Sequence, residues 1–323
     1  MRAVFWPFFS QQDKRTGRVL TETCGDYKMC SWMAERLRIA GWDANVVTPD
    51  DVHVPSDNVA QRLQFHAPDA RKAFADADVA IVHHDHMGFP LRQMFPELKI
   101  VQGCHVDPFE PWPQFAPLMK MAWDAADLVT VLSPSMRVDT KTRVSCWPMA
   151  FDEQLFAETD ELKTIDVLFV NRASATNYTR HVEFLRQIDP DWRVLFTDPT
   201  RYMEHAGLVP VSQLLRDKTH GYRYALKASK VFVALNDNGH GGLSAREAIV
   251  SGCCPVALRC PGYERLLGED WPYFVPSLDE IRETVNHALR DGWPANKSAV
   301  QAAARAESYQ STWPTVVRDL ESL

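Results

Sequence analysis

The chain has 323 residues, of which 46% are hydrophobic and 24% charged, a composition typical of a globular protein with enough length for two domains. Its net charge of −7 argues against a general nucleic-acid coat protein. No apolar run approaches the roughly 20 residues that a membrane-spanning helix needs, so we expect no membrane partner.

The sequence alternates strand patterns with helix patterns from its start. Residues 2–6 are predicted as a first strand rather than a signal peptide, because the short apolar stretch lacks a small-residue cleavage site. Residues 26–41 predict an amphipathic helix that ends at Gly41, with one apolar face made of Met29, Trp32, Met33 and Leu37. Further apolar runs predict strands within 44–50, 77–86, 98–105, 127–135, 165–172, 192–198, 230–238 and 254–258. Helix patterns cover 178–188, 211–218, 222–229 and 244–252, and 304–323 predicts one or two more.

This strand–helix rhythm is typical of parallel α/β sheets with helices on both faces. The rhythm breaks near Trp147 and restarts, which predicts an N-terminal Rossmann-like domain over residues 1–150. A second Rossmann-like domain with C-terminal helices is predicted over 151–323. Neither half has G-x-G-x-x-G after its first strand or a G-x-x-x-x-G-K-[ST] loop, which disfavours a simple dehydrogenase and a P-loop enzyme.

The stretch GHGGLSAREAIVSG, from Gly239 to Gly252, places a glycine-rich loop directly before a helix, an arrangement that presents backbone N–H groups to an anion. With its flanking strands it resembles the donor-binding segment of retaining GT-B glycosyltransferases, especially family 4. The residues that match the family's E-A-x-x-x-G-x-P-V pattern are Glu247, Ala248, Gly252, Pro255 and Val256. Weaker matches extend over nearly the whole chain. The resemblance implies a GT-B fold, in which two Rossmann-like domains face each other across a cleft.

The resemblance also implies a donor site for a nucleoside-diphosphate sugar, which we expect to be a UDP-sugar. Loop amides near Gly241, Gly242 and Leu243 would hold the diphosphate and sugar, and Glu247 the ribose hydroxyls. A competing interpretation needs no ligand, because Ser244 and Glu247 also form an S-x-x-E capping box. The family's first glutamate falls at Gly239, where Asp237 or His240 could substitute. The full predicted donor set is Gly25, Arg172, Arg180, Val209, His240, Gly241, Gly242, Leu243, Ser244 and Glu247.

The resemblance implies a same-face retaining mechanism without a metal or other cofactor. Arg172 would neutralise the leaving diphosphate, and because the family's usual lysine position is Asn177, Arg180 or Lys218 would assist it. His105 matches a family histidine beside the transferred sugar, and Asp85 is our choice for orienting the acceptor. The alternative is a metal site in the run His83, His84, Asp85 and His86.

The acceptor side is predicted from the segment that follows the first strand. Its aromatic residues Trp6, Phe8 and Phe9 could stack on bases, and its cations Lys14, Arg15 and Arg18 could contact phosphates. Phe8 and the three cations are therefore candidate acceptor-binding residues. Phage enzymes that glycosylate hydroxymethylated pyrimidines in double-stranded DNA share this architecture, so such DNA is one candidate acceptor.

Other readings of the same residues remain open. The acceptor could be a small molecule or glycan, and the protein could instead be a nucleotide-sugar epimerase or a non-catalytic nucleotide-sugar-binding module of the same fold. We expect a monomer or homodimer. The seven cysteines include no C-x-x-C pair, which indicates reduced thiols and a cytoplasmic protein (in the host cytoplasm if the source is viral).

Overall fold

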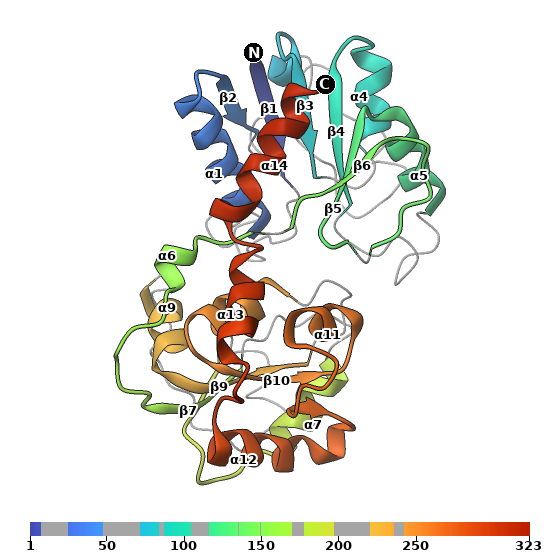
Figure 1. The fold of residues 1–323 in the computed structure, drawn as a ribbon. Coiled ribbons are helices and arrows are strands. Elements are labelled where there is room, and N and C mark those ends of the chain that lie inside the picture. The colour runs from blue at the N-terminus through green and yellow to red at the C-terminus, as the bar shows by residue number, and fades with distance from the viewer. Residues whose placement is uncertain are drawn as a thin grey trace, which may run out of the picture. The chain divides into compact units, whose positions relative to one another are not determined.

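The structure is a computed structural model. It describes residues 1–7, 25–47, 72–83, 87–104, 116–134, 136–148, 150–169, 178–196, 220–235 and 242–323. These residues form two compact units: Met1–Met149 with Pro314–Leu323, and Ala150–Trp313. Each unit is built on one parallel sheet flanked by helices (Figure 1).

The first unit contains a sheet with the strand order β2-β1-β3-β4-β5-β6, in which every pairing is parallel. The strands are β1 (Arg2–Trp6), β2 (Asp43–Val46), β3 (Val79–Val82), β4 (Lys99–Cys104), β5 (Leu128–Val131) and β6 (Val144–Cys146). β3 and β5 are buried at every residue, as expected for central strands covered on both faces. The predicted apolar runs coincide with β1 to β5, whereas the edge strand β6 was not predicted.

Three helices of the first unit are α1 (Gly25–Ile39), α4 (Gly88–Met94) and α5 (Ala116–Ala125). On α1, Met29, Met33 and Leu37 are buried as the helical spacing predicts. Trp32 departs from this face, because it is only partly buried and the Arg36 guanidinium lies over its ring, 5.1 Å from the ring centroid.

The C-terminal helix α14 (Tyr309–Glu321) returns to the first unit in its second half. The buried carboxylate of Asp319 accepts hydrogen bonds from Ser145 Oγ at 2.5 Å and from Trp147 Nε1 at 2.8 Å. Ser145 lies on β6, so this carboxylate joins the last helix to the edge strand of the first sheet.

The second unit contains a sheet with the order β11-β10-β9-β7-β8, again parallel throughout. Its strands are β7 (Ile165–Phe169), β8 (Val194–Phe196), β9 (Ser229–Ala234), β10 (Cys254–Leu258) and β11 (Phe274–Val275). Its helices are α6 (Glu153–Phe156), α7 (Tyr178–Arg186), α9 (His220–Ala228), α10 (Leu243–Val250), α11 (Pro261–Leu267), the 3-10 helix η5 (Leu278–Glu280), α12 (Ile281–Asp291) and α13 (Lys297–Arg305). The α/β prediction of two parallel sheets is confirmed.

Among the described helices of both units, none has the length and apolar character required to cross a membrane.

Candidate functional site

The order of the second sheet reverses between β7 and β9. From this pair the chain continues outward to β8 on one side and to β10 on the other. In open parallel sheets, ligands bind outside the carboxyl ends of the strands at such a reversal. Because α10 is the next helix after β9, its N-terminus belongs to this end of the sheet.

The N-terminus of α10 has features that favour the binding of an anion. Gly242 is its N-cap with φ 63° and ψ 138°, a backbone region that favours glycine. A glycine has no side chain with which to cap the helix, and the first turn contains no acidic residue. The first N–H groups of a helix have no intrahelical acceptor and carry partial positive charge. These groups are therefore suited to bind an anion.

The capping-box interpretation of Ser244 and Glu247 is wrong. Because Gly242 is the N-cap, Ser244 is already the second helical residue and Glu247 lies in the second turn. A capping box would require Ser244 itself at the N-cap.

Glu247 is nearly fully buried, with 8% of its surface exposed, and its Oε2 accepts a hydrogen bond from the Tyr222 hydroxyl at 2.7 Å. Burial, followed by the negative charge of Glu247, raises the pKa of Tyr222 well above its ordinary value, so the hydroxyl keeps its proton and donates it. A buried carboxylate is unfavourable without such donors. Sequence reasoning missed Tyr222, because a contact between residues on two different helices has no local sequence signal.

A buried ion-pair network also holds α10. Arg246 is 1% exposed, and its Nε lies 2.5 Å from Glu307 Oε2. Arg265 of α11 pairs with the other oxygen of Glu307. Burial lowers the pKa of Arg246, and the charge of Glu307 opposes that shift. The carboxylate of Glu307 therefore joins α10 to α11.

The glycine of the E-A-x-x-x-G pattern has a packing reason. Gly252 follows α10 with φ 82°, and a Cβ there would overlap the Glu158 carboxylate. Glu158 in turn accepts from Lys297 Nζ at 2.8 Å and from Gln301 Nε2 at 3.0 Å, and Gln301 also donates to the Ile249 carbonyl. A side chain at Gly252 would therefore disturb the packing of α13 against the end of α10.

The other predicted donor residues are only partly described. Gly25 is the first residue of α1, and Arg180 lies in the first turn of α7 with a half-buried side chain. Leu243 and Ser244 open α10. Arg172, Val209, His240 and Gly241 lie outside the described residues.

In the first unit, the predicted catalytic residues Asp85 and His105 also lie outside the described residues. The structure does describe His83 before Asp85 and Met87 after it. The fully buried Gln102 of β4 accepts from Gly88 N–H at 2.9 Å and donates to the Val82 and Gly103 carbonyls at 3.2 and 2.9 Å. A Cβ at Gly88 would lie 2.8 Å from Gln102 Oε1. One amide thus joins the end of β3, the end of β4 and the start of α4. The sequence does hold a sign of this role, because a glutamine within the apolar run 98–105 must find hydrogen-bond partners when it is buried.

The acceptor residues Phe8, Lys14, Arg15 and Arg18 lie outside the residues that the structure describes. Trp6, which the sequence grouped with the stacking aromatics, is fully buried, and its ring centroid lies 5.7 Å from that of Phe74. It is therefore a core residue and cannot stack on a base.

The metal alternative rested on the run His83 to His86. The His83 side chain is buried with its Nδ1 3.5 Å from Cys30 Sγ. The described residues contain no group of three His, Cys, Asp or Glu side chains that could hold a metal ion. His84, Asp85 and His86 are not among them.

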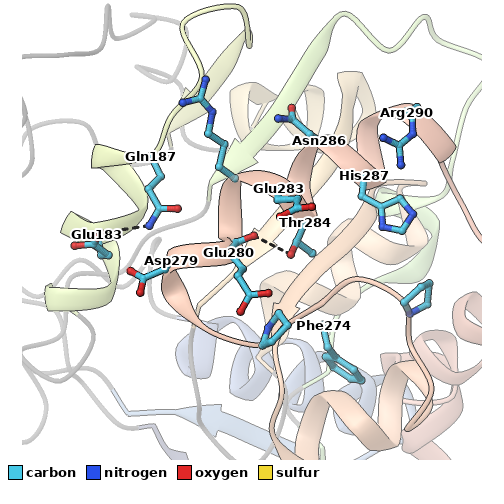
Figure 2. Close-up of a pocket in the computed structure, with 13 residues that line it drawn as sticks. Glu183, Gln187, Phe274, Asp279, Glu280, Glu283, Thr284, Asn286, His287 and Arg290 are labelled. Atoms are coloured by element: carbon cyan, nitrogen blue, oxygen red, sulfur yellow. Dashed lines mark hydrogen bonds between the residues drawn. The ribbon is translucent and has the colours of Figure 1, made fainter.

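A separate groove of about 920 Å³ lies in the second unit between α7 and the η5–α12 segment (Figure 2). Glu183, Asp279, Glu280 and Glu283 contribute carboxylates to its lining. Its arginines Arg282 and Arg290 pair with Asp189 at 2.5 Å and Asp291 at 2.8 Å. No residue of α10 lines this groove, and its acidic lining is unsuited to a diphosphate.

The sequence matches no protein-family model and no curated protein. Several solved structures resemble it over nearly their whole length. Sucrose-phosphate synthase from Thermosynechococcus elongatus has a TM-score of 0.74 at 15% identity, with 100% of this chain and 99% of that chain covered. Anabaena HepE in complex with UDP-glucose has a TM-score of 0.68 at 13% identity, with both chains fully covered. AviGT4, a glycosyltransferase involved in avilamycin A biosynthesis, has a TM-score of 0.62 at 13% identity, with 99% and 96% covered.

These likenesses, together with the two parallel sheets, show that the chain has the GT-B fold. The fold that the sequence resemblance implied is confirmed.

Proposed function

We propose that the protein is a glycosyltransferase that moves a sugar from a nucleoside-diphosphate sugar to an acceptor hydroxyl. The observation that carries this proposal is the start of α10. It presents the N–H groups of a helix N-terminus that follows a glycine N-cap beside a sheet reversal, and it bears the buried carboxylate of Glu247 in its second turn. A similar structure, HepE, holds UDP-glucose.

The donor would bind with its diphosphate at the N-terminus of α10 and its ribose at Glu247. A diphosphate requires several N–H donors, and a ribose diol pairs well with an ionised carboxylate. A UDP-sugar is the donor we propose.

Transfer would retain the configuration at the anomeric carbon. The bond from that carbon to the diphosphate breaks with its electron pair passing to the diphosphate. The acceptor oxygen forms its bond on the same face, and a leaving phosphate oxygen takes the acceptor proton. Arg172 would stabilise the growing diphosphate charge, while His105 and Asp85 would orient the sugar and the acceptor. This chemistry needs no metal or other cofactor.

For the acceptor, we propose a hydroxymethylated pyrimidine in phage DNA, on the strength of the loop cations Lys14, Arg15 and Arg18. A small-molecule acceptor is the second candidate, because AviGT4 is described as acting in avilamycin A biosynthesis.

The test is incubation with a panel of nucleotide sugars, alone and with mixed acceptors that include hydroxymethylcytosine DNA, followed by mass spectrometry. Slow hydrolysis of one donor and transfer to one acceptor support the proposal. Epimerisation of the donor would identify an epimerase, and binding without turnover would identify a binding module; either result would overturn the transferase proposal.

A further inference from the structure

A short hydrogen bond joins the second turn of α10 to α9. The Tyr222 hydroxyl of α9 donates to Glu247 Oε2 at 2.7 Å, and both residues belong to the second unit. A hydrogen bond to a carboxylate is short and about twice as strong as one between neutral groups.

Tyr222 is held in place by its ring. The ring packs edge-on against Phe156 of α6, with centroids 6.2 Å apart and an angle of 70° between the planes. Phe156 packs in the same manner against Phe151, at 6.1 Å and 71°. Both phenylalanines belong to the hydrophobic core of the second unit. The position of the hydroxyl is therefore set by core packing.

The hydrogen-bond direction is also fixed. An ionised carboxylate has no proton to give and can only accept, so the Tyr222 hydroxyl is the donor to Glu247.

We propose that Tyr222 is a positioning residue for nucleotide binding, which fixes the rotation of the Glu247 carboxylate so that its remaining lone pairs meet the ribose hydroxyls. This inference rests on the proposed function of Glu247. A carboxylate offers about four lone-pair positions, and Tyr222 uses one of them. A side-chain torsion that ends in a carboxylate is otherwise broad, so an unheld Glu247 would lose orientational freedom on binding.

The chain contains a matched control. The Tyr273 hydroxyl also makes one hydrogen bond, to the Gly292 carbonyl at 2.8 Å, and its ring packs edge-on against Trp271 at 5.7 Å. Tyr273→Phe therefore removes the same atom and one bond of similar length from the same unit, and Tyr273 makes no contact with Glu247.

The experiment measures UDP and 2′,3′-dideoxy-UDP binding by isothermal titration calorimetry in the parent, Tyr222→Phe and Tyr273→Phe, after circular dichroism and melting confirm that each is folded. We expect Tyr222→Phe to weaken UDP about tenfold, the effect of losing roughly 1.4 kcal/mol. Dideoxy-UDP, which lacks both ribose hydroxyls, should bind the parent and Tyr222→Phe equally. Tyr273→Phe should bind both ligands like the parent.

The other outcomes overturn the inference in distinguishable ways. Equal weakening of UDP and dideoxy-UDP in Tyr222→Phe would show a general structural role, and no weakening would show that Tyr222 does not act on the nucleotide. Either result leaves the proposed function standing if Glu247→Gln still weakens UDP. A parent protein that binds no nucleotide would remove the proposed function and this inference together.

Discussion

Replacing Gln102 with leucine tests how the ends of β3, β4 and α4 are held together. The substitution keeps the side-chain volume similar but removes three hydrogen bonds to backbone groups, at 2.9, 3.2 and 2.9 Å. The Gly88 N–H has a single proton to donate, so losing this acceptor costs the most. The Val82 and Gly103 carbonyls each keep a second lone pair and lose less.

At a net value of about 1 kcal/mol for each hydrogen bond, Gln102→Leu should destabilise the first unit by about 3 kcal/mol. For a domain of this size, 1 kcal/mol corresponds to roughly 2–4 °C, so the melting temperature should fall by about 6–12 °C. Differential scanning calorimetry measures this fall.

Gln187→Leu is the matched control for this prediction. The Gln187 amide donates to the Leu278 carbonyl at 2.7 Å and to Glu183 at 3.3 Å, but the residue is only half-buried. Its loss should cost about 1 kcal/mol. The reasoning is refuted if Gln102→Leu lowers the melting temperature no more than Gln187→Leu does.

Three further predictions concern packing, pH and the acceptor. Gly252→Ala places a Cβ against Glu158 at a position with a positive φ, which strains the backbone. Chemical denaturation should show a free energy of unfolding lower by about 2–4 kcal/mol, and a value equal to that of the parent would contradict the packing described here. Burial alone would raise the pKa of Asp166, but hydrogen bonds from Lys230 and Arg193 lower it to about 2. The ionised Asp166 therefore stabilises the folded state above about pH 4, and this stabilisation is lost as the pH falls towards 2. Acid titration of Asp166→Asn should therefore show a smaller loss of stability over that range than the parent, and identical curves would remove Asp166 from the account. If DNA is the acceptor, replacing Lys14, Arg15 and Arg18 with alanine should flatten the log–log salt dependence of DNA binding by up to about three units, and salt-independent turnover in the parent would exclude DNA.

The central strands could be predicted from the sequence, because a strand buried on both faces is mostly apolar along its length. β3 is apolar throughout, and β5 departs from this only at Thr130. The edge strand β6 is three residues long and partly exposed, so its side chains need not be apolar and the pattern fails. β11, with two residues, is too short to show any period.

Contacts between distant residues could not be predicted, because local periodicity holds no information about them. Asp319 looks like an ordinary polar residue of a surface helix, but its carboxylate is buried against β6 and Trp147. Its partners are chosen by the packing of whole elements.

The residues of the candidate site also fall into those that the sequence could predict and those that it could not. Gly242 and Glu247 could be predicted because a glycine-rich loop, a helix and a following strand are contiguous in the sequence. The role of Ser244 could not, because S-x-x-E fits both a capping box and a helix that begins two residues earlier. Tyr222 belongs to another helix and required the structure.

The most direct measurement of the central claim is calorimetric titration of UDP into the parent protein and into Glu247→Gln. The variant keeps the size of the side chain and the Tyr222 contact point but removes the charge that the ribose hydroxyls would meet. The account predicts that UDP binds the parent, that Glu247→Gln weakens the binding about tenfold or more, and that both proteins melt within a few degrees of each other. Equal UDP affinity in the two proteins, or no binding to the parent, would contradict the assignment of α10 as the nucleotide site.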